Sequence, residues 1–434
     1  MSKQKKLLIL GGKPIGSCEL VQAAKNLGHY VIVADYLPDE ESPAKRIADE
    51  SWNVSTADID TLKDRCLEGG VDGVLAGVHD FNIEKMAELA IALGLPCDTT
   101  PKLQSLCDDK SAFKAHCRAH GIDVAREYSY DEATKLSSDA FPLAVKPRDG
   151  SGSRGFSKVL RVSGLAAAVE HAIDFSFCGE PLIEEFIDAE ALIAQYTAHS
   201  GKVFFCGLTD KYSHSMGEAG APVMAFQSAP AACTNKFLAE VNEKVVSLLE
   251  ELGFAEGPIW LEFFNCGGRF VFNEIGFRFG GSLTYHLVRK LYGVDQLRLL
   301  IDHALGETCD GTLVETPQCA FKGSYAIWPV HLKPGKIAWV EGLDWLRQQE
   351  RFFAMAQVHW AGDTIEPWGS AQQVFAYLHL CGNDLADVLG FAREVLEHVK
   401  VIGEDGANLL FALFDPTDQK FMQNVPSFVR AKLC

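Results

Sequence analysis

The sequence predicts an α/β fold that continues into α+β structure and comprises more than one domain. The chain has 434 residues, and domains commonly contain about 100–200 residues, so two to four hydrophobic cores are expected. Strands alternate with helices through residues 1–97, a pattern typical of a parallel sheet with crossover connections. Short strands and a hairpin turn of sequence NCGG follow in the middle of the chain, which indicates antiparallel structure there.

The first unit begins with a strand that ends in a glycine turn. Apolar runs predict further strands, and periodic segments between them predict helices; the strands cover residues 5–12, 30–36 and 72–78, and the helices 17–29 and 82–96. A glycine turn that leads from a strand into a helix presents backbone N–H groups at the helix N-terminus, where an anion can bind.

This glycine turn has three interpretations. A dinucleotide site needs glycine at the first, third and sixth positions of the turn; Gly11 and Gly16 fit, but Lys13 stands at the third position. Asp35 ends the second strand, where an NAD-binding protein would place an acidic ribose ligand. The turn could equally hold a substrate phosphate or carboxylate, or no ligand at all. The sequence leaves these alternatives open.

Composition narrows the class of protein. The formal net charge of −18 disfavours a general nucleic-acid-binding protein. No segment is apolar for about 18 residues, so no membrane span is expected, and the N-terminal apolar run lacks a small-residue cleavage site. The 13 cysteines are scattered without a CxxC pair, which points to reduced thiols, and these features together predict a cytoplasmic protein. Cys97, Cys107 and Cys117 recur at equal intervals, a spacing attributed to coincidence or helix packing.

The middle of the chain surrounds a glycine-rich loop with short strands. A helical stretch opens at Thr100 and Pro101 and closes at Gly121. Strands are predicted over residues 126–131, 142–148, 157–162 and 181–187, helices over 164–175 and 235–254, and the hairpin over 258–278. The pattern over residues 310–434 again predicts a mixture of helices and strands.

The glycine-rich loop follows Lys146 in the segment VKPRDGSGSRGFSKV, residues 145–159. It contains three glycines, two serines and two arginines: Gly150, Gly152, Gly155, Ser151, Ser153, Arg148 and Arg154. Glycines allow close approach of backbone N–H groups to a ligand, so the loop suits a lid over polyphosphate. The alternative is a hairpin tip without a ligand, but a lysine at the end of an apolar strand would neutralise phosphate charge.

The hairpin places one glutamate on each of its strands. Glu262 and Glu274 are flanked by apolar residues, and two carboxylates in such a setting repel each other unless a cation lies between them. Mg²⁺ bridging phosphate groups takes carboxylate oxygens of this kind. Arg278 follows and could reach the same phosphates or a substrate carboxylate. The alternative is two glutamates that face solvent.

The segment LIEEFIDAE, residues 182–190, combines an apolar strand with acidic residues. An adenine needs a hydrophobic slot and backbone donor and acceptor groups, and a ribose needs an acidic acceptor. The segment could supply both, or could be an edge strand with charged residues.

Six segments occur in an order and at a spacing that resemble an ATP-grasp enzyme: DDKSAFK, LAVKPRDGSGSRG, LIEEFI, TDKYS, WLEFF and NEIGFR. The branch that the chain most resembles contains biotin carboxylase, the purine-pathway ribonucleotide synthetases and the L-amino acid ligases. The resemblance covers the whole chain, including LILGGKPIG near the start and KPGKI near the end. It implies an ATP-grasp domain over residues 98–308, with a lid subdomain at about 123–185. A Rossmann-like pre-ATP-grasp domain would precede it over 1–97, and a small mixed α/β domain would follow over 309–434.

The resemblance also implies roles for individual residues. Lys110 and Lys146 would hold the α- and β-phosphates of ATP, with the loop Gly150, Ser151, Gly152, Ser153 and Gly155 closing over them. Glu184 would lie by the adenine, backbone groups of Glu185 and Ile187 would read its edge, and Glu190 would bind the ribose.

Around the transferred phosphoryl group, the resemblance implies four more residues. Lys211 would reach the γ-phosphate or the acyl phosphate, and Arg278 would steady the transferred group. Glu262 and Glu274 would ligate one or two Mg²⁺ ions, with Mn²⁺ as a substitute. Many members have asparagine where this chain has Gly276, so the ligands of a second metal are in question.

The implied reaction is the ATP-dependent activation of a small carboxylate as an acyl phosphate, which an amine then attacks. The acceptor pocket is expected near the first glycine turn, Asp80 and Asn82, and the region of Ser282, Tyr285 and His286. Bicarbonate as the activated acid is the nearest alternative. An NAD-dependent oxidoreductase and a non-catalytic nucleotide-binding subunit are the others. ATP and small molecules are the expected partners, with no nucleic acid or membrane, and the resemblance suggests a homodimer.

Overall fold

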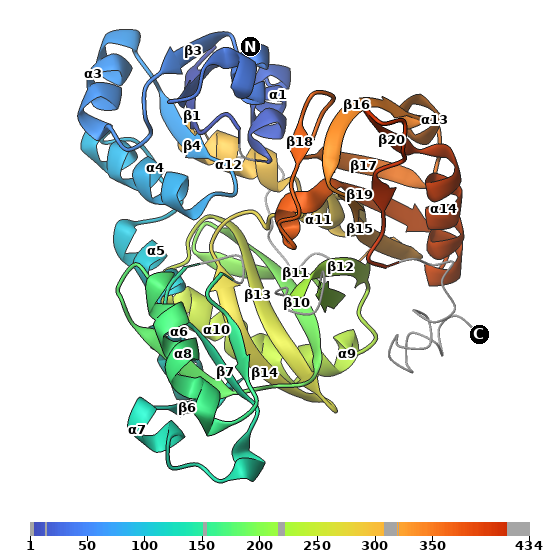
Figure 1. Cartoon of the computed structure of the whole chain (residues 1–434). Helices are drawn as coiled ribbons and strands as arrows, with labels where there is room; N and C mark the ends of the chain where they lie inside the picture. Colours follow the sequence, from blue (N-terminus) through green and yellow to red (C-terminus); the bar gives the residue numbers. More distant parts are fainter. Residues whose placement is uncertain are drawn as a thin grey trace.

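The computed structural model describes residues 4–13, 15–150, 154–215, 222–307, 319 and 321–414. The N-terminal unit (blue in Figure 1) is a four-stranded parallel sheet with helices on its faces, as the alternation of strands and helices predicts. The strands are β1 (Lys6–Leu10), β2 (Tyr30–Asp35), β3 (Glu50–Asn53) and β4 (Gly73–Ala76), in the order β3-β2-β1-β4. The helices are α1 (Ser17–Asn26), α2 (Pro43–Ile47), α3 (Ile59–Gly69) and α4 (Asp80–Leu93), with a 3₁₀ turn η1 (Asp39–Glu41).

The helical stretch expected before Gly121 is divided in two. It forms α5 (Pro101–Asp108) and α6 (Lys110–Ala119), separated by Asp109. Asp109 has extended backbone angles, and its side chain accepts a hydrogen bond from the N–H of Ala112, so it caps α6. The cap fixes Lys110 as the first residue of this helix.

A four-stranded antiparallel sheet, here called the lid sheet, carries the base of the glycine-rich loop. Its strands are β6 (Glu127–Tyr128), β7 (Leu143–Pro147), β8 (Ser157–Val159) and β9 (Pro181–Glu185), in the order β6-β9-β7-β8. The helices between these strands are α7 (Tyr130–Ala133) and α8 (Leu165–Asp174), with 3₁₀ turns η2 (Ser138–Ala140) and η3 (Val162–Gly164). Helix α8 packs its apolar side on β7, where Leu143, Val145 and Leu165 form a small core.

The largest sheet, here called the central sheet, has ten strands. Nine follow one another in the order β17-β19-β15-β12-β11-β10-β13-β14-β5, and β21 pairs with β15. The strands from the middle of the chain are β5 (Asp123–Val124), β10 (Glu190–His199), β11 (Lys202–Ser215), β12 (Pro222–Ala229), β13 (Gly257–Cys266) and β14 (Arg269–Gly276). Those from its last third are β15 (Ser324–Leu332), β17 (Phe352–Gln357), β19 (Val374–Gly382) and β21 (Leu410–Phe411).

The predicted hairpin is β13 and β14, and its turn forms as the NCGG sequence indicates. Gly267 and Gly268 have φ of 63° and 95°, which glycine adopts without steric cost in a two-residue hairpin turn. The helix expected over 235–254 forms as α9 (Thr234–Phe237), a π-helical turn η4 (Leu238–Asn242) and α10 (Glu243–Leu252), which pack on the apolar face of this sheet.

The remaining elements join the parts of the chain. They are α11 (Tyr285–Tyr292), α12 (Gln296–Ala304), β16 (Gly335–Glu341), β18 (Thr364–Ile365), β20 (Lys400–Gly403), α13 (Leu343–Arg347), α14 (Leu385–His398) and η5 (Ala371–Gln373). Helix α12 follows the middle strands in sequence but packs on α1 and β4 of the N-terminal unit (Figure 1). Strand β15 pairs with β12, so the central sheet runs across the expected boundary at residue 309. The three-domain division remains a proposal.

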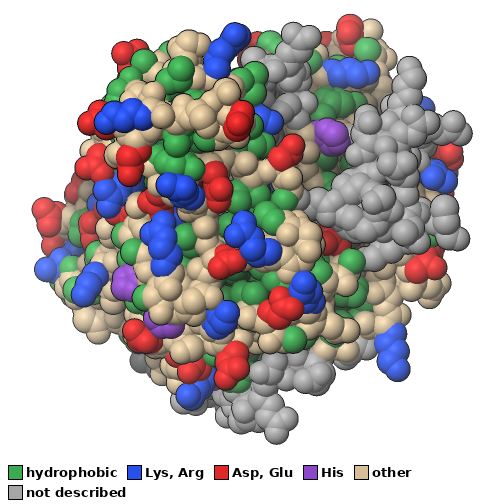
Figure 2. Space-filling model, turned by 90° about the horizontal axis from the view of Figure 1, so that it is seen from below, with side chains coloured by type: hydrophobic (Ala, Val, Ile, Leu, Met, Phe, Trp, Pro, Cys, Tyr) green, Lys and Arg blue, Asp and Glu red, His purple; other side chains and the backbone are tan. Residues whose placement is uncertain are grey.

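Of the equally spaced cysteines, Cys107 and Cys117 are buried in the core between α5, α6 and the central sheet, which agrees with helix packing. In the described part of the chain, no helix is both long and apolar enough to cross a membrane. The face seen in Figure 2 carries acidic and basic side chains side by side.

Candidate active site

The two glutamates of the hairpin lie directly opposite each other on β13 and β14. Glu262 and Glu274 are register partners, and partners in an antiparallel pair project their side chains from the same face of a sheet. Glu262 is only 6% exposed. Their neighbourhood therefore carries one buried and one half-buried carboxylate, and such a pair requires positive charge nearby.

Lys211 on β11 supplies part of that charge, because its ammonium group forms an ion pair with Glu262. Asn273, which no sequence motif singled out, donates a hydrogen bond of 2.7 Å to the other carboxylate oxygen of Glu262. Burial alone would raise the pKa of Glu262, but Lys211, Asn273 and Lys146 outweigh burial and hold this pKa below its usual value. Glu262 is therefore an ionised carboxylate at neutral pH.

Lys146 brings the lid sheet into contact with this surface. Its ammonium group donates a hydrogen bond of 3.0 Å to Asn273 and lies 2.8 Å from Glu184 on β9. Burial lowers the pKa of Lys146 to about 8, although Glu274 and Glu262 favour its charged form. The predicted phosphate ligand and the predicted metal ligands thus lie in one network.

Glu184 is 2% exposed and is held by two lysines, Lys146 and the fully buried Lys114 on α6. Lys114 was not expected from the sequence; its position four residues after Lys110 on one helix is the signal that could have found it. Burial lowers the pKa of Lys114 well below its usual value, and the charge of Lys146 lowers it further. The expected place of Glu184 beside an adenine remains a proposal.

Lys110 lies at the base of the glycine-rich loop. Its ammonium group donates a hydrogen bond of 2.7 Å to the carbonyl oxygen of Gly150. The guanidinium of Arg148 is held by ion pairs with Asp109, at 2.8 Å, and with Glu180, so it does not extend over the loop. These contacts fasten the start of α6 to the end of β7 and to the segment after α8.

Gly155 has φ of 72°, and a Cβ atom there would lie 2.8 Å from both Phe175 and Pro147, so packing at the loop base requires this glycine. Ser151, Gly152 and Ser153 lie outside the described residues.

A cavity of about 850 Å³ opens at the end of β9, between the connector to β10 and the turn of the hairpin. Glu185, Ile187 and Asn265 are among its lining residues. The N–H of Glu185 donates to the carbonyl oxygen of Arg126 at 2.9 Å, so this N–H cannot contact an adenine. The backbone of Glu190 pairs with Asn265, at the edge of the same cavity. Cavities of this size commonly bind small ligands.

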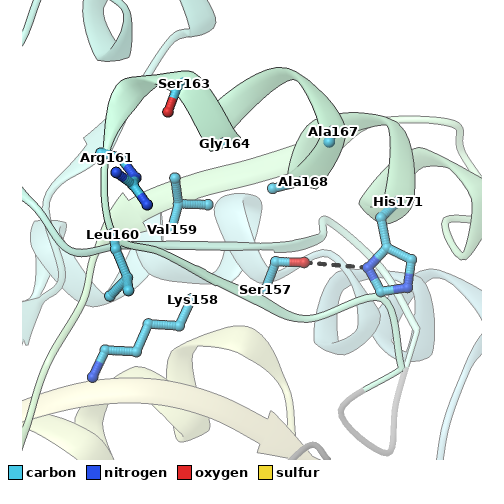
Figure 3. A pocket seen from close by; sticks show the side chains of 10 residues that line it. All are labelled: Ser157, Lys158, Val159, Leu160, Arg161, Ser163, Gly164, Ala167, Ala168 and His171. Atoms are coloured by element: carbon cyan, nitrogen blue, oxygen red, sulfur yellow. Dashed lines mark hydrogen bonds between the residues drawn. The ribbon is translucent and has the colours of Figure 1, made fainter. Parts of the chain in front are cut away.

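A smaller hollow lies on the lid sheet, over β8 and the start of α8. Figure 3 shows Ser157 and His171 joined across it, at 3.2 Å, while the side chain of Lys158 points away from His171. None of the predicted site residues lines this hollow.

Arg278 lies beyond the hairpin and contacts the N-terminal unit. Its guanidinium pairs with both carboxylate oxygens of Asp80, the first residue of α4, and stacks 5.4 Å from the ring of Trp260. Asp108 at the end of α5 interacts with the charges of both Asp80 and Arg278. Burial and the charge of Asp80 raise the pKa of Asp108 to about 6, while Arg278 has the opposite effect.

The other residues proposed for an acceptor pocket are largely occupied. Asn82 accepts a hydrogen bond of 2.9 Å from Thr56. His286 packs against Phe353 and His379, and burial lowers its pKa to about 4, so it is neutral at physiological pH. Tyr285 is 2% exposed. These contacts favour a packing role for His286, whereas the buried hydroxyl of Tyr285 has no hydrogen-bond partner among the described residues.

The first glycine turn does not resemble a dinucleotide site in its contacts. The carboxylate of Asp35 accepts hydrogen bonds from the N–H groups of Gly12 and Leu37, at 2.7 and 2.9 Å. A Cβ atom at Gly12 would lie 2.1 Å from the hydroxyl of Ser42, so packing explains this glycine. An acidic side chain already used by its own backbone is a poor ribose ligand, which disfavours the NAD interpretation.

The donor set fits magnesium held together with a nucleotide. No cluster of three or more histidine, cysteine or carboxylate side chains suited to a metal occurs among the described residues. Two facing carboxylates supply too few ligands for Mg²⁺ alone, which prefers six oxygens and is commonly completed by phosphate oxygens and water.

Comparisons with known proteins agree with this architecture. No family model matches the chain. A formate-dependent phosphoribosylglycinamide formyltransferase from Erythrobacter litoralis is 27% identical over 280 residues, which are 62% of this chain and 70% of that protein. An L-amino acid ligase from Bacillus licheniformis has a similar structure, with a TM-score of 0.74, 19% identity, and coverage of 93% of this chain and 100% of that one.

A biotin carboxylase from Campylobacter jejuni matches with a TM-score of 0.78 and 17% identity, over 98% of this chain and 97% of that one. At these identities the solved structures show the fold. The ordered motifs, the paired carboxylates facing two lysines and the similarity in sequence and fold together place the chain in the ATP-grasp superfamily.

Proposed function

We propose that this chain is an ATP-dependent ligase that activates a small carboxylate as an acyl phosphate and joins it to an amine, with release of ADP and phosphate. The observation that carries the proposal is the continuous network Lys146–Asn273–Glu262–Lys211, which connects the lid sheet to the central sheet. The network brings two cations and an ionised carboxylate together, which supports binding of a triphosphate and its metal there.

In the first step an oxygen of the substrate carboxylate attacks the γ-phosphorus of ATP. A phosphorus–oxygen bond forms to the carboxylate, the bond to the β–γ bridging oxygen breaks, and ADP leaves. Lys146 and Lys110 would bind the phosphates that become ADP, while Lys211 and Arg278 would neutralise charge on the transferred group. The chain thus converts a poor electrophile into an acyl phosphate.

In the second step the amine attacks the carbonyl carbon, the bond to the phosphate oxygen breaks, and the amine loses a proton as the amide forms. The loop based on Lys110 and Gly155 would exclude water, which would otherwise hydrolyse the acyl phosphate.

Glu262 and Glu274 would hold Mg²⁺, which when bound neutralises phosphate charge. Mn²⁺ prefers the same oxygen ligands and would be an acceptable substitute. We propose one protein-ligated metal rather than two, because Trp260 occupies the space beside Gly276 where other members carry an asparagine side chain.

The cavity at Glu185 and Ile187 is the proposed adenine pocket, with the carbonyl of Glu185 and the N–H of Ile187 as its polar contacts and Glu190 as the ribose ligand. Formate is the first acid to test, because the relative from Erythrobacter litoralis is named for formate dependence. A homodimer and a cytoplasmic location are also proposed; free thiols at all described cysteines suit a reducing compartment.

The test is a phosphate-release assay with ATP and Mg²⁺ against formate, bicarbonate and pooled carboxylates, with and without pooled amines. An acid that accelerates phosphate release, and that hydroxylamine traps as a hydroxamate, supports the proposal. Release with bicarbonate alone would favour a carboxylase, and no acid-dependent release would refute the ligase. Light scattering on the eluted protein gives the oligomeric state.

A further inference from the structure

Two polar side chains beside the metal carboxylates have no role in the mechanism above. Trp260 stands two residues before Glu262 on β13, and alternate residues of a strand project from the same face. Gln195 on β10 is the register partner of Trp260. Cross-strand partners share a face, with Cβ atoms about 4.5–5.5 Å apart, so both side chains lie on the face that carries Glu262 and Glu274.

The indole ring of Trp260 is held in one place by its surroundings. A Cβ atom at Gly276, its partner on β14, would come within 2.3 Å of the ring, so the ring covers the backbone there. On its other sides the guanidinium of Arg278 lies 5.4 Å from the ring, and a Cβ atom at Gly280 would touch its edge at 3.9 Å. The residues around the ring therefore fix the direction of its N–H group.

Both side chains present donors that nothing satisfies. The indole nitrogen of Trp260 and the amide nitrogen of Gln195 are buried and lack a hydrogen-bond partner in the described part of the chain. The amide oxygen of Gln195 accepts from the hydroxyl of Thr284 at 3.1 Å, and the amide nitrogen is the end that has no partner. A buried donor without an acceptor costs about 1–3 kcal/mol, so two neighbouring ones call for a ligand that supplies acceptors.

We propose that the indole N–H of Trp260 and the side-chain amide of Gln195 bind the carboxylate of the acid substrate beside Arg278, and later the carbonyl oxygen of its acyl phosphate. This inference rests on the proposed ligase function. A carboxylate is an acceptor-only group, and neutral donors can hold it beside Arg278, whose own charge is paired with Asp80. Donors in fixed positions also polarise the carbonyl when the amine attacks.

The main test is Trp260→Phe, which keeps an aromatic ring and removes the donor. With the acid that supports the fastest phosphate release, kcat/KM for that acid should fall about 5- to 150-fold, while KM for ATP stays within about twofold. The melting temperature should fall slightly, because the smaller ring fills less of the space over Gly276, and the unchanged KM for ATP shows that the nucleotide site is still folded. Gln195→Glu, which keeps the oxygen that Thr284 contacts and removes both amide hydrogens, should weaken use of the acid in the same way.

Tyr196→Phe is the matched control, because Tyr196 follows Gln195 on β10 but faces the other side, where its hydroxyl donates to Asn242 at 3.0 Å. This variant should lose stability and keep the KM for the acid. Trp260→Phe with unchanged kcat/KM for the acid, or with changed KM for ATP only, would overturn the inference and leave the ligase function standing. A wild-type protein with no acid-dependent phosphate release would overturn both.

Discussion

Lys146 on the lid sheet donates a hydrogen bond of 3.0 Å to Asn273 on the central sheet, 127 residues further along the chain. Asn273 in turn donates to Glu262, so one amide group connects a proposed phosphate ligand to a proposed metal ligand. Each end of this connection lies on a separate sheet, and the amide fixes the distance between them.

Replacement of this amide should impair nucleotide binding more than folding. In Asn273→Ala, Lys146 and Glu262 both lose a partner, and hydrogen bonds to charged groups contribute about 1.5–3 kcal/mol. We expect the Kd for ATP with Mg²⁺, measured by calorimetry, to rise about 10- to 100-fold. Asn242→Ala is the control, because Asn242 accepts a hydrogen bond from Tyr196 on the opposite face of the central sheet, away from the site. An equal loss of affinity in the control would contradict the assigned role of Asn273.

Glu274→Gln should abolish turnover and leave the fold intact. The glutamine side chain has nearly the same shape as glutamate but lacks the negative charge that would bind Mg²⁺. Loss of one such electrostatic contribution typically lowers kcat by about 10²–10³-fold. Phosphate release and far-ultraviolet circular dichroism check the two halves of this expectation. Glu256→Gln, which removes a carboxylate paired with His199 away from the site, should retain activity. Full activity of Glu274→Gln would remove the metal assignment.

Gly276→Ala should destabilise the protein through Trp260. The new methyl group would lie 2.3–2.5 Å from three ring atoms of the indole, and overpacking of this kind costs about 1–3 kcal/mol. Urea denaturation measures the loss in the free energy of unfolding. The double variant Gly276→Ala with Trp260→Leu should recover part of this loss, because the smaller side chain makes room. Additive losses in the two variants would show that the residues do not interact.

The pKa of Asp108 predicts a pH dependence of stability. Burial raises this pKa from 3.8 to about 6, so between these values the folded state binds more protons than the unfolded state. The contribution of Asp108 to stability is therefore full below about pH 4 and is lost as the pH rises to about 6. Asp108→Asn should have a higher melting temperature than the wild type at pH 7.5, and this gain should shrink at pH 4.5. A constant difference across this range would show that Asp108 titrates normally.

The sequence by itself determined the parallel N-terminal sheet and the β13–β14 hairpin, with one glutamate on each of its strands. These features depend on local patterns, since two glycines fix the hairpin turn and the turn fixes the register of the pairs next to it, from Cys266–Arg269 to Phe263–Phe272. A β-bulge between Glu262 and Phe263 then shifts the register by one residue, so the pairs Glu262–Glu274 and Trp260–Gly276 could not be read from the turn.

Only the tertiary structure decided the contacts between distant elements. It pairs Arg278 with Asp80 across 198 residues, buries Lys114 against Glu184, and extends the central sheet from β12 to β15. Such contacts arise when separate faces pack together, and no local periodicity records which polar groups then meet. A residue type can show that Lys114 carries a charge, but the packing of α6 against β9 determines that the charge is buried and paired.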